Sequence, residues 1–189
     1  HLDRSVDLSR RMSAGNFEAQ ALMLLARLLA TQGETDKARQ YADDAVSVAR
    51  NVGMTFIGPT TLAQQAKFAQ HAMQRRAILK EGDDILDSGC VAHNQFWLPF
   101  TGIDLSLAAH EWDEVERYAK RLETFTRSQP LAWSDFVIDR GRALSTWGQG
   151  NRDKSMETEL KRLRGIAEGV GLKPALIDIE SALATLRTV

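Results

Sequence analysis

The stretch Gly33-Glu-Thr-Asp-Lys-Ala38 decides the fold, because it ends one apolar helical segment and opens another. Apolar residues recur at intervals of three and four before it, from Leu22 to Leu29, and after it, from Ala38 to Val52. Gly33 permits a tight turn between the two helices. Alanines at positions 38, 42, 45 and 49 let the second helix approach the first closely. The stretch therefore predicts an antiparallel helical hairpin.

Three further segments resemble this one: Ala72–Ala77, His110–Val115 and Gly150–Ser155. Aligned on their last residues, 38, 77, 115 and 155, the four segments are 39, 38 and 40 residues apart. A period near 39 is typical of a two-helix solenoid unit, at the long end of the tetratricopeptide range. Ser5–Arg10 also matches Ala45–Arg50 at an offset of 40, so we expect the chain to begin inside an earlier repeat.

These patterns predict an all-α fold, a tetratricopeptide-like right-handed α-α superhelix of stacked antiparallel hairpins in a single domain, 1–189. No sustained alternation of strand type occurs in the sequence. We expect the chain, which starts with His1, to be a fragment of a larger multidomain protein. The expected segments are 1–13 as the end of an earlier repeat, hairpins at 17–53, 58–89, 93–127 and 134–171, and a C-terminal capping helix at 175–187.

The composition argues against several classes of partner. Apolar residues make up 43% and charged residues 26% of the chain, which is typical of a globular protein. The formal net charge of −1 has no basic excess, so we expect no nucleic-acid partner. No apolar run approaches the ~20 residues that cross a bilayer, so we expect no membrane partner. Cys90 is the only cysteine, which favours a reducing, cytoplasmic location.

No set of residues predicts catalysis. Cys90 and His93 could share one side of a helix, but zinc needs three or four ligands and no second Cys/His cluster is present. The acidic run between Glu81 and Asp87 lacks the spacing of a calcium loop and is interpreted as a solvated helix face. We therefore expect no enzyme, no catalytic, cofactor-binding or metal-binding residues, and no cofactor.

Aromatic and charged residues on the first helices of the hairpins are the candidate binding residues. In the repeat frame, Trp97 and Trp147 face the concave groove, and Arg27, Asp104 and Arg140 map to the same side. Aromatic side chains and arginine are typical of binding hot spots. Asp104 and Arg140 occupy equivalent faces of neighbouring first helices, so they could pair. The alternative is that both tryptophans only pack between repeats.

Two resemblances extend this interpretation. Gln32–Ala38, with its following alanines, resembles the tetratricopeptide pattern in the longer form of MalT-like regulators. Gly89–Trp97, Trp112–Ala119 and Trp133–Ala143 resemble the C-terminal helical region of bacterial adenylate/guanylate cyclase-related proteins. In those proteins, a class III cyclase domain and a nucleoside-triphosphatase module precede the repeats. Pro99 departs from the uninterrupted helix expected in such relatives.

The resemblances imply a non-catalytic repeat module that takes part in signalling. It would bind a protein or peptide partner, sense a ligand, or contact effector domains of the same polypeptide. The alternative is a self-association scaffold that pairs two copies of the parent protein into a homodimer. An exposed groove with arginine would favour the first function, and a large apolar patch on a terminal repeat would favour the second.

Overall fold

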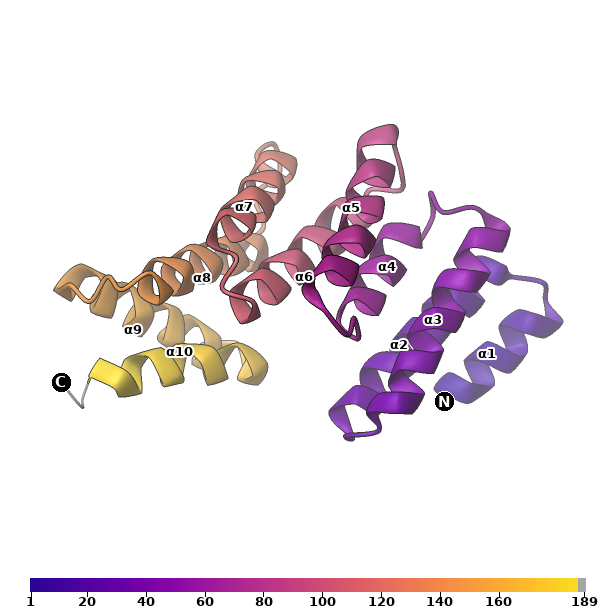
Figure 1. Cartoon of the computed structure of the whole chain (residues 1–189), viewed down its shortest axis with the longest axis horizontal. Coiled ribbons are helices and arrows are strands. Elements are labelled where there is room, and N and C mark those ends of the chain that lie inside the picture. Colours follow the sequence, from indigo (N-terminus) through magenta and orange to yellow (C-terminus); the bar gives the residue numbers. More distant parts are fainter. Residues whose placement is uncertain (187–189) are drawn as a thin grey trace. The chain divides into compact units, whose positions relative to one another are not determined.

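The computed structural model describes residues 1–186, and every regular element in that part of the chain is an α-helix (Figure 1). The predicted all-α class is therefore confirmed. The last expected segment, 175–187, ends at Arg187, outside the described residues. The helices are α1 (Leu2–Arg11), α2 (Gly15–Thr31), α3 (Thr35–Val52), α4 (Gly58–Ala66), α5 (Ala72–Ser88), α6 (Asn94–Ala108), α7 (Trp112–Thr126), α8 (Ala132–Gly148), α9 (Lys154–Gly169) and α10 (Lys173–Leu186).

The chain divides into two compact units where a single domain was expected. The N-terminal unit comprises residues 1–101 and the C-terminal unit residues 102–189. The boundary falls within α6, so the first half of that helix belongs to one unit and the second half to the other. Each unit is described separately below.

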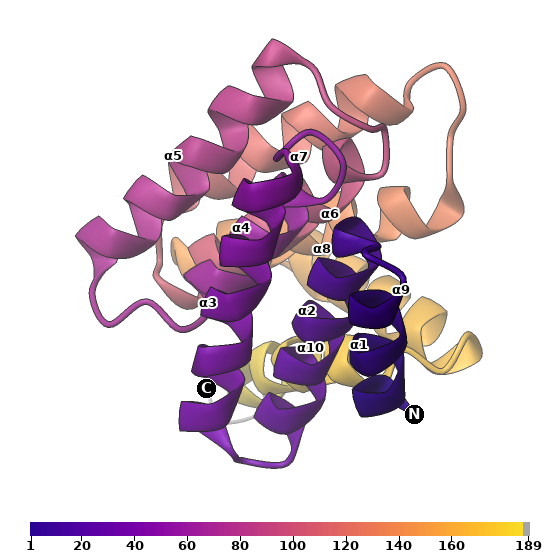
Figure 2. The same ribbon diagram turned by 90° about the vertical axis from the view of Figure 1, so that its right-hand side faces the viewer.

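In the N-terminal unit, α2 packs between α1 and α3 and also contacts α4 (Figure 2). Helices α4 and α5 form the next pair. The core between α2 and α3 is built from Leu22 and Ala26 on one side and Ala38, Ala42 and Ala45 on the other, all without solvent exposure. Small side chains on α3 thus allow the close approach that the sequence predicts.

In the C-terminal unit, α8 packs against α7, α9 and α10, and α9 also pairs with α10. Large side chains fill this core, unlike the alanine-rich contact between α2 and α3. Tyr118 and Leu122 from α7, Leu160 and Leu163 from α9, and Ile179 from α10 are all fully buried. The predicted apolar stripes of the second helices therefore face inward.

One type of turn recurs at the ends of helices. In the turn after α2, Gly33 has a φ of +82° and the amide of Glu34 donates to the carbonyl of Leu29 at 3.0 Å. This six-to-one hydrogen bond, with a left-handed residue before its donor, defines the Schellman motif. Within residues 1–186 the same bond closes five helices, with the left-handed residues Ser13, Gly33, His110, Gly150 and Gly171. Three of the four segments aligned by sequence therefore begin at structurally equivalent positions.

The second of the four aligned segments was placed in the wrong register. Ala72–Ala77 is not a turn, because α5 already begins at Ala72 and Ala77 is exposed on it. The inward positions of the second helices are spaced by four, three and four residues. They are 38, 42, 45 and 49 in α3, and 115, 119, 122 and 126 in α7. In α5 the buried members of this pattern are Leu79, Gly82 and Leu86, so its first position is 75 and not 77.

Several glycines inside helices mark close approaches, and two of them involve α6. A Cβ atom on Gly82 of α5 would lie 2.2 Å from Cδ1 of the fully buried Leu98 of α6. A Cβ atom on Gly102 of α6 would lie 2.5 Å from the ring of Tyr118 of α7. Pro99 lies inside α6 and does not end it.

Candidate functional site

The N-terminal unit contains a pocket of about 300 Å³, here called the N-terminal pocket. Its walls come from α2, from the segment that leads into α4 and the first turn of α4, and from His93 with the start of α6. The structure brings two of the five predicted binding residues, Arg27 and Trp97, together in this lining. The lining residues are Gln20, Met23, Leu24, Arg27, Phe56, Ile57, Thr60, His93 and Trp97.

Aromatic rings in edge-to-face contact build one part of this pocket. The ring centroid of Phe56 lies 6.2 Å from that of Phe17 and 5.7 Å from that of His93. The indole of Trp97 contacts Phe96 at 5.1 Å and Phe100 at 6.0 Å. Edge-to-face pairs at such distances stabilise one relative orientation of the rings. The rings of Phe56 and Trp97 are therefore held in position by the neighbouring aromatic side chains.

Asn94 holds the start of α6 beside the pocket. Its side chain is fully buried, and its Oδ1 accepts from the amide of Thr60 at 3.2 Å and the hydroxyl of Thr60 at 2.8 Å. Its Nδ2 donates to the carbonyls of Phe56 at 2.8 Å and Val91 at 3.1 Å. These bonds use both polar atoms of the amide and tie the lining segment Phe56–Thr60 to the start of α6. Sequence reasoning missed Asn94, since a single asparagine near a helix start also suits an exposed cap.

The electrostatics of the N-terminal pocket are simple. Arg27 is exposed and makes no ion pair or hydrogen bond within the described part of the chain. No carboxylate is among the lining residues. Burial lowers the pKa of His93 against a smaller opposing effect from its hydrogen bond to the Phe56 backbone, so the imidazole is neutral at pH 7. The pocket therefore has one positive charge, on Arg27.

The C-terminal unit contains a second pocket, of about 500 Å³, here called the C-terminal pocket. The other three predicted residues, Asp104, Arg140 and Trp147, lie in its lining. The walls come from the end of α6, the start of α7, and from α8 and α10. The lining residues are Asp104, Leu107, Ala108, Trp112, Arg140, Leu144, Trp147, Pro174, Asp178, Ser181, Ala182 and Thr185.

Arg140 is held by two carboxylates from two other helices. Its Nη1 donates to Oδ1 of Asp104 at 2.8 Å, and its Nη2 donates to Oδ2 of Asp178 at 3.0 Å. Its side chain is only 7% exposed. Burial alone would lower the pKa of Arg140, but the carboxylates of Asp104 and Asp178 together outweigh burial and raise it. The anticipated pairing of Asp104 with Arg140 is present. Asp178, in the helix expected only to cap the stack, was not anticipated.

Trp147 is also largely enclosed. Its indole is nearly buried, and the guanidinium of Arg152 lies over the ring, 3.6 Å from its centroid. Beside it on α8, a Cβ atom on Gly148 would lie 2.4 Å from the indole of Trp112. Trp147 and Arg140 are thus buried and have little surface for a partner. Trp97 is half-buried and Arg27 is exposed, so both remain accessible.

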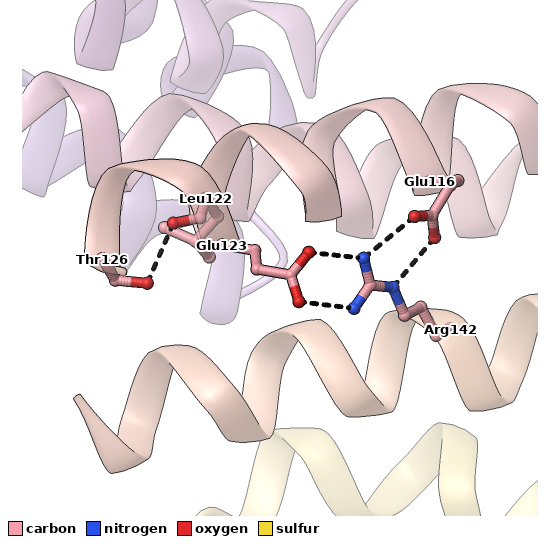
Figure 3. A network of polar contacts seen from close by, with 5 residues as sticks. All are labelled: Glu116, Leu122, Glu123, Thr126 and Arg142. Atoms are coloured by element: carbon pink, nitrogen blue, oxygen red, sulfur yellow. Dashed lines mark hydrogen bonds and ion pairs between the residues drawn. The ribbon is translucent and has the colours of Figure 1, made fainter. Parts of the chain in front are cut away.

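A second arginine of α8 binds α7. Arg142 donates through Nε and Nη2 to Glu116, both at 2.9 Å, and through Nη1 and Nη2 to Glu123 at 3.2 and 3.0 Å (Figure 3). The hydrogen bond from Arg142 lowers the pKa of Glu123. This double fork joins the outer sides of α7 and α8. These bonds give Arg142 a structural role, and Arg142 is not among the residues that line the C-terminal pocket.

Other candidate chemistry is limited. Cys90 forms no disulfide, and no group of three or more His, Cys, Asp or Glu residues suited to a metal ion occurs among residues 1–186. Within the same part of the chain, no helix combines the length and apolar character needed to cross a membrane. Comparison with models of protein families, with curated sequences and with solved structures gives no match to this chain.

Proposed function

We propose that this chain is a tetratricopeptide-like repeat module that binds a partner or ligand and thereby regulates an effector domain on the same polypeptide. The effector class suggested by the sequence resemblance is a class III nucleotide cyclase with a nucleoside-triphosphatase module, in the cytoplasm. The Schellman turns at Gly33, His110 and Gly150 support the repeat architecture, because they end three helices at equivalent positions.

The observation that carries the binding function is the N-terminal pocket. An exposed arginine with no partner in the described chain and a half-buried tryptophan come from two helices, α2 and α6, to the same concavity. Arginine and tryptophan are the side chains that contribute most to binding at interfaces. A repeat surface with such a pair has the chemistry of a recognition site.

A peptide array tests the proposal. The labelled full chain is applied to short synthetic peptides of varied charge and apolar content, in parallel with Trp97→Ala and with Asn51→Ala as a control on an exposed face of α3. We expect a subset of peptides to be retained by the wild type and the control and released by Trp97→Ala. Retention of no peptide contradicts a peptide partner, and equal retention by all three proteins contradicts a peptide site at Trp97.

Self-association is the second candidate, and exposed apolar side chains near the α1–α2 turn favour it. Met12 and Phe17 are 68% and 60% exposed. Large exposed apolar side chains are frequent at protein interfaces. Light scattering during size-exclusion chromatography, over a range of protein concentrations, tests this candidate. A dimer that dissociates in Phe17→Ser supports the scaffold, and a monomer at every concentration rejects it.

A further inference from the structure

We propose that the N-terminal pocket binds a small organic acid, with its carboxylate on Arg27 and its apolar body against the aromatic lining. This inference rests on the proposed binding function and names the class of ligand. It is argued from the charge, the size and the polar groups of the pocket.

The charge of the pocket requires an anion. Arg27 is the one charged side chain in the lining, and it has no counter-ion within residues 1–186. The C-terminal pocket gives the contrast, because Arg140 there is already paired with Asp104 and Asp178. The guanidinium of Arg27 retains all its donors, and a carboxylate matches that planar fork with two parallel hydrogen bonds.

The size and the apolar surface of the pocket indicate what the uncharged body of the ligand should be. A volume of about 300 Å³ lies at the lower end of the range for small-molecule pockets. Met23, Leu24, Phe56, Ile57 and Trp97 line it with apolar surface. A phenyl or short aliphatic body fits such a space, and a large or highly polar ligand does not.

The polar groups indicate a monoanion. His93 lines the pocket as a neutral imidazole, because burial lowers its pKa and it therefore adds no second positive charge. The hydroxyl of Thr60 is already bonded to Asn94, and Asn94 fixes the same wall through Phe56. The wall is thus preorganised around a single cationic group, which matches one carboxylate and not two.

Calorimetric titration at pH 7.5 tests the proposal with a matched pair of probes, sodium 3-phenylpropionate and the uncharged 3-phenylpropionamide. The two molecules share the apolar body and differ in the charged group. We expect the acid to bind roughly tenfold or more tightly than the amide, as for a hydrogen bond between charged groups. Perturbed NMR signals of the side-chain amide of Gln20 and the indole of Trp97 place the probe in the pocket.

Two matched variants distinguish the effect of the Arg27 charge from a general effect of losing a surface arginine. Arg27→Gln is expected to reduce the affinity for the acid to that for the amide, while Arg11→Gln, an exposed arginine of α1 outside the pocket, leaves both affinities unchanged. Equal affinities for acid and amide in the wild type, no binding of the acid, or no effect of Arg27→Gln overturns the proposal. Peptide retention that depends on Trp97 but not on Arg27 overturns the organic-acid assignment while the general binding function stands.

Discussion

The guanidinium of Arg140 on α8 donates to the carboxylate of Asp104 on α6 at 2.8 Å, and both residues were chosen from the sequence as parts of a binding face. The geometry gives this pair another role. Arg140 is nearly buried and also bonds to Asp178 of α10, so one side chain links three helices of the C-terminal unit. A binding hot spot needs accessible surface, and Arg140 has little.

Replacing Arg140 tests that structural role. Arg140→Ala leaves a cavity and removes the counter-ion of two partly exposed carboxylates, so we expect a loss of about 1–3 kcal/mol in the free energy of unfolding. Arg140→Met keeps the volume and needs no counter-ion, so its cost should be smaller. Urea denaturation followed by circular dichroism measures both. Equal stability of Arg140→Ala and wild type would show that the linkage contributes nothing.

Two helical glycines make a matched pair of substitutions. At Gly102, an added Cβ would lie 2.5 Å from the buried ring of Tyr118, whereas at Gly165 of α9 no atom lies within 4 Å. Gly102→Ala should therefore cost about 1–3 kcal/mol through overpacking. Gly165→Ala should stabilise the protein by roughly 0.5–1 kcal/mol, because alanine has the higher helix propensity. Thermal unfolding of the two variants checks the signs, and a Gly102→Ala variant as stable as wild type would rule out the close α6–α7 approach.

Local patterns in the sequence were sufficient for most of the helices and for three of the four aligned turns. Apolar spacing of three and four located α3 and α7, and Gly33 and Gly150 marked left-handed turns because glycine adopts that conformation without strain. His110 adopts the same left-handed conformation, with a φ of +59°. Its equivalence to Gly33 and Gly150 was predicted only from the apolar pattern of the flanking helices.

Contacts between distant residues were harder to predict. Asn94 bonds to Thr60 and Asp178 bonds to Arg140, each across more than thirty residues, and neither bond follows from helical periodicity. The exposure of Trp97 and Trp147 was equally hard to predict. Trp97 and Trp147 were assigned to one kind of position, yet Trp147 is nearly buried under Arg152, while Trp97 is half-buried in the N-terminal pocket. Exposure depends on neighbours that the local pattern does not contain.

His93 gives the protein a defined pH dependence. The pKa of His93 is lowered from its ordinary 6.5, mainly by burial, so the unfolded chain takes up a proton at a higher pH than the folded chain. The stabilising contribution of the neutral imidazole is present above pH 6.5 and is lost as the pH falls through the lower folded value. His93→Gln should therefore weaken the decline in stability with falling pH. Urea midpoints of wild type and variant between about pH 7.5 and 5 measure this difference. Parallel pH profiles would contradict it.

Ala38 and Ala77 test the register of the repeat. The sequence alignment equates them, but Ala38 is fully buried between α2 and α3, whereas Ala77 is exposed on α5. Ala38→Leu adds volume at a position with no solvent exposure, so it should cost about 1–3 kcal/mol through overpacking. Ala45→Leu, at the next inward position but one on α3, should do the same. Ala77→Leu places the added atoms in solvent and should change the free energy of unfolding by less than about 0.5 kcal/mol. Urea denaturation of the three variants gives the comparison. If Ala77→Leu lowered the free energy of unfolding as much as Ala38→Leu, Ala77 would have to be buried against another helix, as Ala38 is. That result would support the original alignment of the two alanines.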